Sequence, residues 1–239
     1  MSSIFLTSGP VFSVKNGSGE RKAAKINNKL LLENLKKEIR KCENLLFVCS
    51  SPDDYKKNDA VANLISKSLS LSGLKFRMYD LIDSRNWLFS KGLINNADLI
   101  ILLGGDPIEQ IEFFNNIELK DKLKKYNNCL MGISAGTINM ADYVYCSKDG
   151  KIESSLYYRG LGITNINIEP HFNIEDTQRI NNVLLPDSNE RPFVALPDES
   201  FIMLKNNTIK LYGEAYYFNE GQYKKIDEDL ENLYNRREK

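Results

Sequence analysis

Residues 129–136 read Cys-Leu-Met-Gly-Ile-Ser-Ala-Gly, an apolar run that leads into a G-x-S-x-G pentapeptide centred on Ser134. Helix-compatible residues follow, up to Tyr145. A strand, a tight turn of small residues and a helix form the context of a nucleophile elbow, in which the serine occupies a sharp turn. The same residues also suit an ordinary strand-to-helix turn with a capping serine. Both interpretations predict a strand at 129–133 and a helix at 137–145.

The alternation of strand and helix extends on both sides of this stretch. Unbroken apolar runs, typical of strands buried on both faces, stand at 4–6, 45–49 and 99–103, and a further strand is predicted at 75–79. Helical spacing of apolar residues occupies 28–40, 59–71, 108–114 and 119–126. Strands that alternate with helices predict an α/β fold, here a three-layer, mostly parallel sheet with helices on both faces.

After Tyr145 the apolar runs become shorter. They predict strands at 160–163, 166–168, 193–196, 201–204, 208–212 and 215–218, with Asn206-Asn207 as a hairpin turn. Helix-like segments stand at 176–185 and in the polar tail at 227–239. No Pro/Gly/Ser-rich linker divides the chain, so we expect residues 1–239 to form a single α/β domain.

The composition limits which cellular compartment and which binding partners we expect for this protein. Basic and acidic residues number 32 each, so charge gives no reason to expect nucleic acid or an anionic membrane as partner. No apolar stretch approaches the ~20 residues that span a bilayer, and the N-terminus lacks the pattern of a signal peptide. The cysteines show no CxxC spacing, which predicts reduced thiols in a cytoplasmic protein and no metal site. These cysteines are Cys42, Cys49, Cys129 and Cys146.

His171 is the only histidine in the 239 residues. A serine hydroxyl is a poor nucleophile until a base removes its proton, and histidine is the usual base near neutral pH. If Ser134 is a nucleophile of the usual kind, His171 is therefore its only imidazole partner. Pro170 restricts the backbone before the histidine and favours a defined position. A structural histidine is the alternative.

Other predicted strand ends carry glycines or acids. Gly104-Gly105-Asp106-Pro107 follows the run at 99–103, at the edge where sites gather in open parallel sheets. The amides of Gly105 and Ala135 can together form an oxyanion hole, and the same segment suits a helix start with Asp106 as N-cap.

Two neighbouring acids, Asp198 and Glu199, follow the run at 193–196. Either carboxylate can accept the Nδ1 proton of the histidine and hold its tautomer. A solvated acidic turn is the alternative.

Together these segments resemble the aspartyl dipeptidase (peptidase E) and cyanophycinase family of serine peptidases. The resemblance rests on four motifs in order: Gly104-Gly105-Asp106, the elbow around Ser134, Pro170-His171-Phe172 and Pro197-Asp198-Glu199-Ser200. It implies a class I glutamine amidotransferase-like fold, with Ser134 as nucleophile, His171 as base and Asp198 as triad acid. This chain has Leu-Pro-Asp where the family usually has Ile-Pro-Glu, so Glu199 remains the alternative acid.

The resemblance implies a peptidase that acts on short peptides, with a preference for an N-terminal aspartate. Such a substrate needs a cation for its carboxylate, and Arg179 lies where the family carries arginines; Arg159 is another candidate. Asp149 is a candidate partner for the substrate ammonium. No metal or organic cofactor is needed for this chemistry.

Two alternatives remain open. One is hydrolysis of another amide, such as a β-aspartyl or isopeptide bond, on the same three residues. The other is a non-catalytic, ligand-binding member of the fold. We expect a small peptide as the partner, without nucleic acid or membrane, and leave a homodimer open.

Overall fold

The computed structural model describes residues 2–15, 17, 19–150 and 153–226. Its main sheet has seven strands in the order β13-β12-β1-β7-β6-β4-β5. The bounds are β1 Ser3–Thr7, β4 Asn44–Val48, β5 Met78–Ile82, β6 Leu99–Leu102, β7 Cys129–Ile133, β12 Phe201–Lys205 and β13 Thr208–Tyr212. Strands β1, β7, β6, β4 and β5 pair in parallel with their neighbours in this order. Strand β12 pairs antiparallel with both β1 and β13. The predicted mostly parallel sheet is confirmed.

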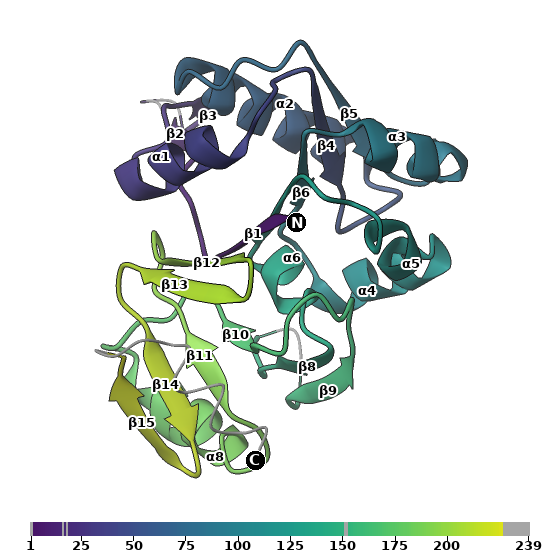
Figure 1. Cartoon of the computed structure of the whole chain (residues 1–239). Helices are drawn as coiled ribbons and strands as arrows, with labels where there is room; N and C mark the ends of the chain where they lie inside the picture. The colour runs from purple at the N-terminus through teal and green to yellow at the C-terminus, as the bar shows by residue number, and fades with distance from the viewer. Residues whose placement is uncertain (1, 16, 18, 151–152, 227–239) are drawn as a thin grey trace.

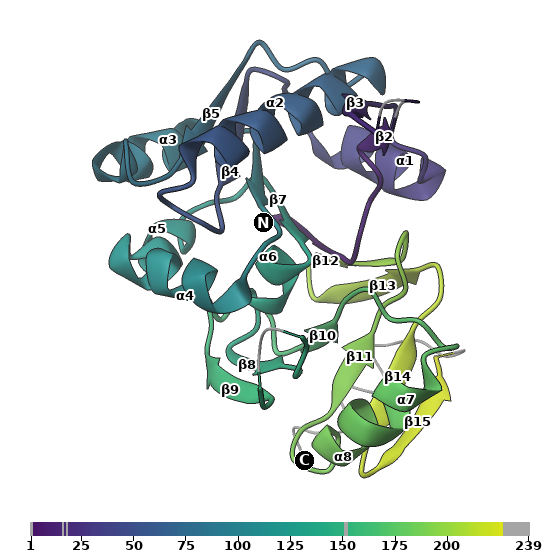
Figure 2. The same ribbon diagram turned by 180° about the vertical axis from the view of Figure 1, so that it is seen from behind.

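Helices cover both faces of this sheet, with α1 and α2 on one side and α4, α5 and α6 on the other (Figures 1 and 2). The helices of this half are α1 Lys29–Glu38, α2 Tyr55–Leu71, η1 Trp87–Phe89, α3 Ser90–Asn96, α4 Pro107–Asn116, α5 Leu119–Leu123 and α6 Ala135–Ile138. The side chain of Asp106 accepts from two amides at the start of α4, with Pro107 in its first turn. This segment is therefore a capped helix start, as one of the two interpretations predicted.

A second, smaller sheet carries the segment that leads to His171. Its order is β10-β11-β14-β15, with bounds β10 Ile168–Glu169, β11 Phe193–Ala195, β14 Tyr216–Asn219 and β15 Gln222–Lys225. A continuous helical stretch, α7 Thr177–Arg179, η2 Ile180–Leu184 and α8 Leu185–Asp187, packs beside it (Figure 2). The apolar cluster between them includes Phe172, Phe193 and Phe218.

Two hairpins complete the described structure, β2 Ser13–Lys15 with β3 Arg21–Ala23 and β8 Tyr143–Cys146 with β9 Leu156–Arg159. The predicted helix at 137–145 is wrong after Ile138, because 143–146 pair with 156–159 instead. The predicted strand at 160–163 is also wrong. Gly160 and Leu161 donate to main-chain oxygens of Asp142 and Asn139, so this segment packs against the residues that follow α6.

Smaller differences concern positions. The strand predicted at 75–79 lies at Met78–Ile82, and α2 begins earlier than predicted because Asp54 caps it. The turn at Asn206-Asn207 is confirmed, with positive φ at both residues. The predicted helix at 227–239 lies outside the described residues.

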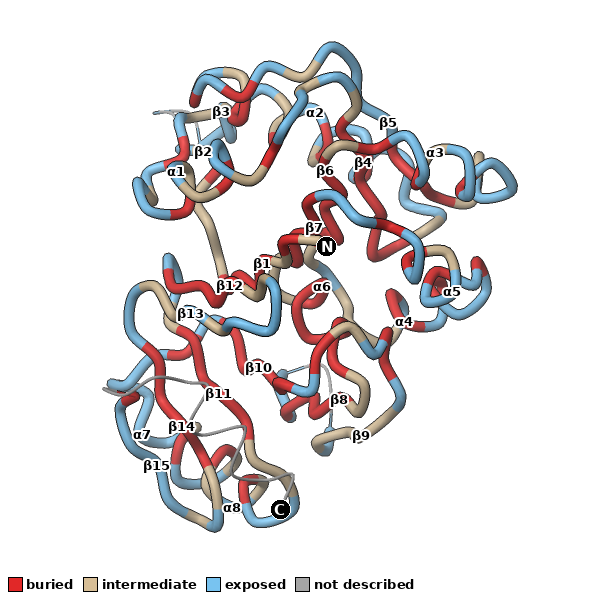
Figure 3. Tube along the Cα trace, viewed as in Figure 1, coloured by how far each residue is buried: buried red, intermediate tan, exposed pale blue. Residues whose placement is uncertain are grey.

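The core follows the central strands, whose buried course is red in Figure 3. Every residue of β6 is fully buried, which explains its unbroken apolar run. Among the described residues, no helix combines the length and apolar character needed to cross a membrane.

Candidate active site

Ser134 occupies a sharp turn between β7 and α6, with φ 50° and ψ −111°. Such a backbone costs about 1–3 kcal/mol for a residue other than glycine and persists only where its surroundings enforce it. The two glycines of the pentapeptide allow the close packing that holds this turn in place. A Cβ on Gly132 would lie 2.7 Å from the Thr137 amide nitrogen, and one on Gly136 would overlap the Leu102 main chain. The spacing of the motif is therefore required by packing.

His171 lies just beyond β10, and its ring joins two residues distant in the sequence. Its Nε2 is 2.9 Å from Ser134 Oγ, and its Nδ1 is 2.7 Å from Asp198 Oδ1. A carboxylate only accepts hydrogen bonds, so the neutral ring donates from Nδ1 and leaves Nε2 to accept the serine proton. This is the hydroxyl–imidazole–carboxylate line that activates a serine.

The two neighbouring acids point in different directions. Asp198 contacts the ring of His171, whereas Glu199 Oε1 accepts from Asn27 Nδ2 at 2.5 Å. The main-chain oxygen of Glu199 also accepts from the Asn28 side chain, next to the start of α1. A positive φ of 70° at Glu199 turns the chain between the two carboxylates. The structure thus brings Asp198, and not Glu199, to the imidazole.

The backbone of Gly104-Gly105 borders Ser134, since a Cβ on Gly104 would lie 3.5 Å from Ser134 Cβ. Gly105 has φ 153°, and a Cβ there would overlap the Ser50 side chain. Ala135 is the first residue of α6, where an amide has no acceptor within the helix. Because α6 is a single turn, its dipole is small. Stabilisation of an oxyanion beside the serine therefore depends on hydrogen bonds from individual main-chain amides.

The structure brings Arg179 to Glu169, a buried residue of β10. Arg179 Nη2 lies 2.6 Å from Glu169 Oε1 and 2.7 Å from Ser147 Oγ, and Nη1 donates to the Lys148 main-chain oxygen. Burial raises the pKa of Glu169, and the arginine opposes that rise. Burial also acts to lower the pKa of Arg179, but the charge and the hydrogen bond of Glu169 act the other way, and the pKa is raised overall. A substrate-binding role of Arg179 or Asp149 stays a prediction.

Arg159, the other candidate cation, lies at the end of β9. Its Nη1 is 2.7 Å from Asp142 Oδ2, and its guanidinium lies over the Tyr143 ring. Both partners are at the surface, so this pair contributes little to stability.

Ser8, directly after the carboxyl end of β1, is a site residue that was not predicted from the sequence. Its hydroxyl accepts from the His171 amide at 2.7 Å and donates to Asp198 Oδ1 at 3.1 Å. Its position in the sequence could have indicated it. The turn after the first strand lies at the same end of the parallel sheet as the turns after β6 and β7, where sites gather.

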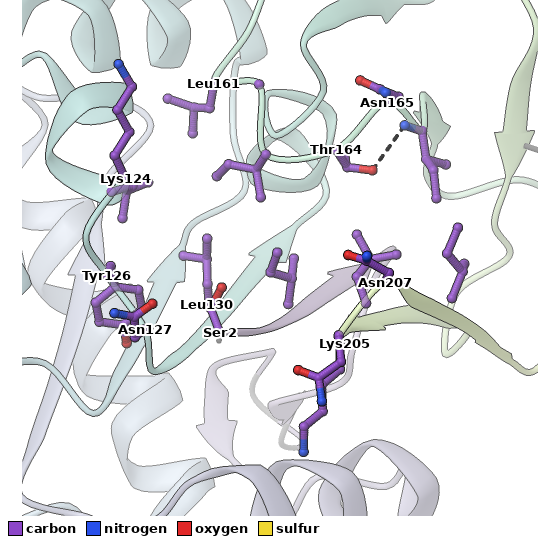
Figure 4. A pocket seen from close by; sticks show the side chains of 18 of the residues that line it. Ser2, Lys124, Tyr126, Asn127, Leu130, Leu161, Thr164, Asn165, Lys205 and Asn207 are labelled. Carbon is purple, nitrogen blue, oxygen red and sulfur yellow. Dashed lines mark hydrogen bonds between the residues drawn. The ribbon is translucent and has the colours of Figure 1, made fainter. Parts of the chain in front are cut away.

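A separate hollow of about 820 Å³ lies at the opposite end of the sheet (Figure 4). Leu130 near the start of β7 lines it, and the strand runs from there to Ser134 at the other edge. Three lysines line it, each ion-paired with an acid: Lys120 with Asp142, Lys124 with Asp121 and Lys205 with Glu38. Within the described part of the chain, no group of three or more histidine, cysteine or acidic side chains gathers as a metal site.

An α/β sheet with a serine elbow, an imidazole in reach of its hydroxyl and a carboxylate behind the ring has the architecture of a serine hydrolase. The family model described as Peptidase family S51 matches residues 17–212. The chain therefore belongs to peptidase family S51 and is a serine-type peptidase.

The fold is also similar to a solved structure from Listeria monocytogenes EGD-e, described as a "Putative Peptidase E Protein". The TM-score is 0.61 and the identity 14%, over 89% of this chain and 98% of the other. This likeness supports the fold. The search of curated proteins returned no match.

Proposed function

We propose that Ser134 is the nucleophile, His171 the general base and Asp198 the acid that orients the imidazole. The observation that carries the proposal is the unbroken contact from Ser134 Oγ to His171 Nε2 and from His171 Nδ1 to Asp198. About half of each side chain, 53% of His171 and 58% of Asp198, is exposed. A peptide can therefore reach these three residues directly from solvent.

The chemistry follows from this arrangement. His171 Nε2 takes the Ser134 proton while Oγ attacks the peptide carbonyl, and the Gly105 and Ala135 amides stabilise the oxyanion. His171 then gives its proton to the leaving amine. Water, deprotonated by the same imidazole, hydrolyses the acyl-enzyme and restores the serine. No step needs a metal or organic cofactor.

We further propose short peptides as substrates, with preference for an N-terminal aspartate, in a cytoplasmic setting. Membership of family S51 and the fold likeness to a protein described as peptidase E support this substrate class. The second candidate is a β-aspartyl or isopeptide bond. The ion pair of Arg179 with Glu169 favours the isopeptide in particular, because an isopeptide substrate need not present a carboxylate to a free arginine, whereas a β-aspartyl peptide keeps its α-carboxylate.

A dipeptide panel tests the proposal. Purified protein is incubated with Asp-Leu, Ala-Leu, Lys-Leu, β-Asp-Leu and an ε-linked isopeptide, in parallel with Ser134→Ala and with Ser154→Ala, an exposed serine outside the site. We expect Asp-Leu to be cleaved fastest, with a loss of about 10⁴-fold or more in kcat/KM for Ser134→Ala only. Equal activity of Ser134→Ala and wild type would contradict the mechanism. Faster cleavage of the β-Asp or isopeptide substrate would select the second candidate.

A further inference from the structure

Ser8 contacts all three residues of the hydroxyl–imidazole–carboxylate line. Its main-chain oxygen accepts from the Ser134 amide at 3.1 Å. Its hydroxyl accepts from the His171 amide at 2.7 Å and donates to Asp198 Oδ1 at 3.1 Å. One residue thus holds the backbone of the nucleophile, the backbone of the base and the carboxylate of the acid.

Ser8 is well placed for this because it directly follows a rigid strand. It is fully buried, and the preceding β1 pairs on both sides, with β7 and β12. His171 and Asp198, by contrast, are exposed and follow short strands of the smaller sheet. A functional group keeps its geometry when a rigid element supports it, and Ser8 provides that support from the main sheet.

The hydroxyl of Ser8 also restrains how the carboxylate faces the ring. Asp198 Oδ1 accepts both from His171 Nδ1 and from Ser8 Oγ, so rotation of the carboxylate breaks two hydrogen bonds. The next residue, Gly9, lets β1 approach closely. A Cβ there would overlap the Asp198 carboxylate and lie 3.1 Å from His171 Cε1.

We propose that Ser8 is a positioning residue of the active site, which holds Asp198 against Nδ1 and so keeps the proton of the neutral imidazole on that nitrogen. Nε2 then stays free to accept from Ser134. The proposal rests on the proposed function for its kinetic consequence. Its structural consequence, the tautomer of His171, is independent of activity.

Kinetics of two serine variants test the consequence for catalysis. Ser8→Ala is compared with Ser188→Ala, because Ser188 is another buried serine whose hydroxyl accepts from one amide and donates to one oxygen. We expect Ser8→Ala to lower kcat about 10- to 100-fold with KM within about twofold, since misplaced catalytic groups cost rate. Ser188→Ala is expected to lower the melting temperature similarly and to leave kcat unchanged.

Nitrogen NMR tests the tautomer directly. His171 is the only histidine, so the two ring nitrogens of ¹⁵N-histidine-labelled protein need no assignment to a residue. We expect the neutral ring of the wild type and of Ser188→Ala to carry its proton on Nδ1. In Ser8→Ala the Nε2-protonated form should become a substantial fraction, because the hydrogen bond at Nδ1 selects the tautomer.

An unchanged tautomer in folded Ser8→Ala, with kcat no lower than that of Ser188→Ala, would overturn the proposal. If Ser8→Ala does not fold, Ser8→Cys carries the same test, since a thiol of similar shape is a weaker hydrogen-bonding group. It should show the tautomer shift and at least about a fivefold loss in kcat, and the absence of both would overturn the proposal. An inactive wild type would contradict the proposed function alone, because the tautomer would still report on Ser8.

Discussion

At the scale of single residues, two adjacent acids have separate positions. Asp198 meets the imidazole and Glu199 meets the asparagines before α1. Asp198→Asn should lower kcat by about 10³- to 10⁴-fold, because an amide at this position can stabilise the wrong tautomer of His171. Glu199→Gln should leave kcat within about threefold. Steady-state kinetics of both variants check this, and a larger loss in Glu199→Gln than in Asp198→Asn would contradict the assignment.

The sequence indicates the residue types of the site but not all of their contacts. Ser134 and His171 stand out, one through its pentapeptide and the other because it is unique in the chain. Which of two adjacent acids faces the ring depends on the positive φ at Glu199, which no local pattern predicts. Ser8 was missed because its partners, His171 and Asp198, are 163 and 190 residues away.

At the scale of elements, the elbow depends on close packing of α6 against the sheet. Gly136→Ala places a Cβ on the Leu102 main chain and should destabilise the protein by about 1–3 kcal/mol, with loss of activity as Ser134 shifts. The matched variant is Gly92→Ala at an exposed position of helix α3, where a Cβ meets nothing within 4 Å. It should stabilise by about 0.5–1 kcal/mol. Urea unfolding measures both, and similar effects of the two variants would contradict the packing argument.

The ion pair of Arg179 with Glu169 connects α7 to β10. Glu169 is the last residue of β10 and precedes His171 by two residues. Arg179→Met leaves the buried Glu169 without its cation and should destabilise the protein by about 3–5 kcal/mol near neutral pH. Burial raises the pKa of Glu169, and loss of the arginine raises it further. The folded variant then binds this proton more tightly than the unfolded chain, so stability falls as the pH rises from about 4.5, the ordinary value, through the raised pKa.

Unfolding of Arg179→Met and wild type at several pH values measures this difference. The gap in unfolding free energy should narrow on acidification, and a second substitution, Glu169→Gln, should restore part of the loss at neutral pH. A gap that is constant with pH would show that Glu169 does not titrate in the variant.

The elements differ in how well the sequence predicts them. Strands β4, β6 and β7 are unbroken apolar runs, and their burial in the main sheet makes them easy to recognise. Residues 143–146 pair with 156–159, which no local periodicity indicates, and the first of these two strands overlaps the helix predicted at 137–145. Helical spacing and strand pairing compete in such short apolar runs, and tertiary contacts decide between them.

At the scale of the whole molecule, the smaller sheet carries His171 and the larger one carries Ser134, so the site depends on both. We propose that the chain folds as one domain. Phe218→Ala removes a fully buried ring that stacks on Phe193 and should destabilise by about 3–5 kcal/mol. Trp87, the only tryptophan, lies in η1, just after edge strand β5 of the main sheet.

The tryptophan makes this prediction measurable. In a single cooperative unit, Phe218→Ala shifts the denaturation midpoint of Trp87 fluorescence as much as that of far-UV circular dichroism. A tryptophan transition that stays at the wild-type midpoint, while part of the dichroism is lost earlier, would show two independent units.

His171 activates Ser134 in the proposed mechanism, and covalent labelling of the serine measures this activation without any choice of substrate. Folded wild type and His171→Ala are treated with a fluorophosphonate, and the modified residue is located by peptide mass mapping. We expect one adduct, on Ser134, in the wild type and at least about a hundredfold slower labelling in His171→Ala. Folded wild type that remains unlabelled, or an adduct on another residue, would contradict this mechanism.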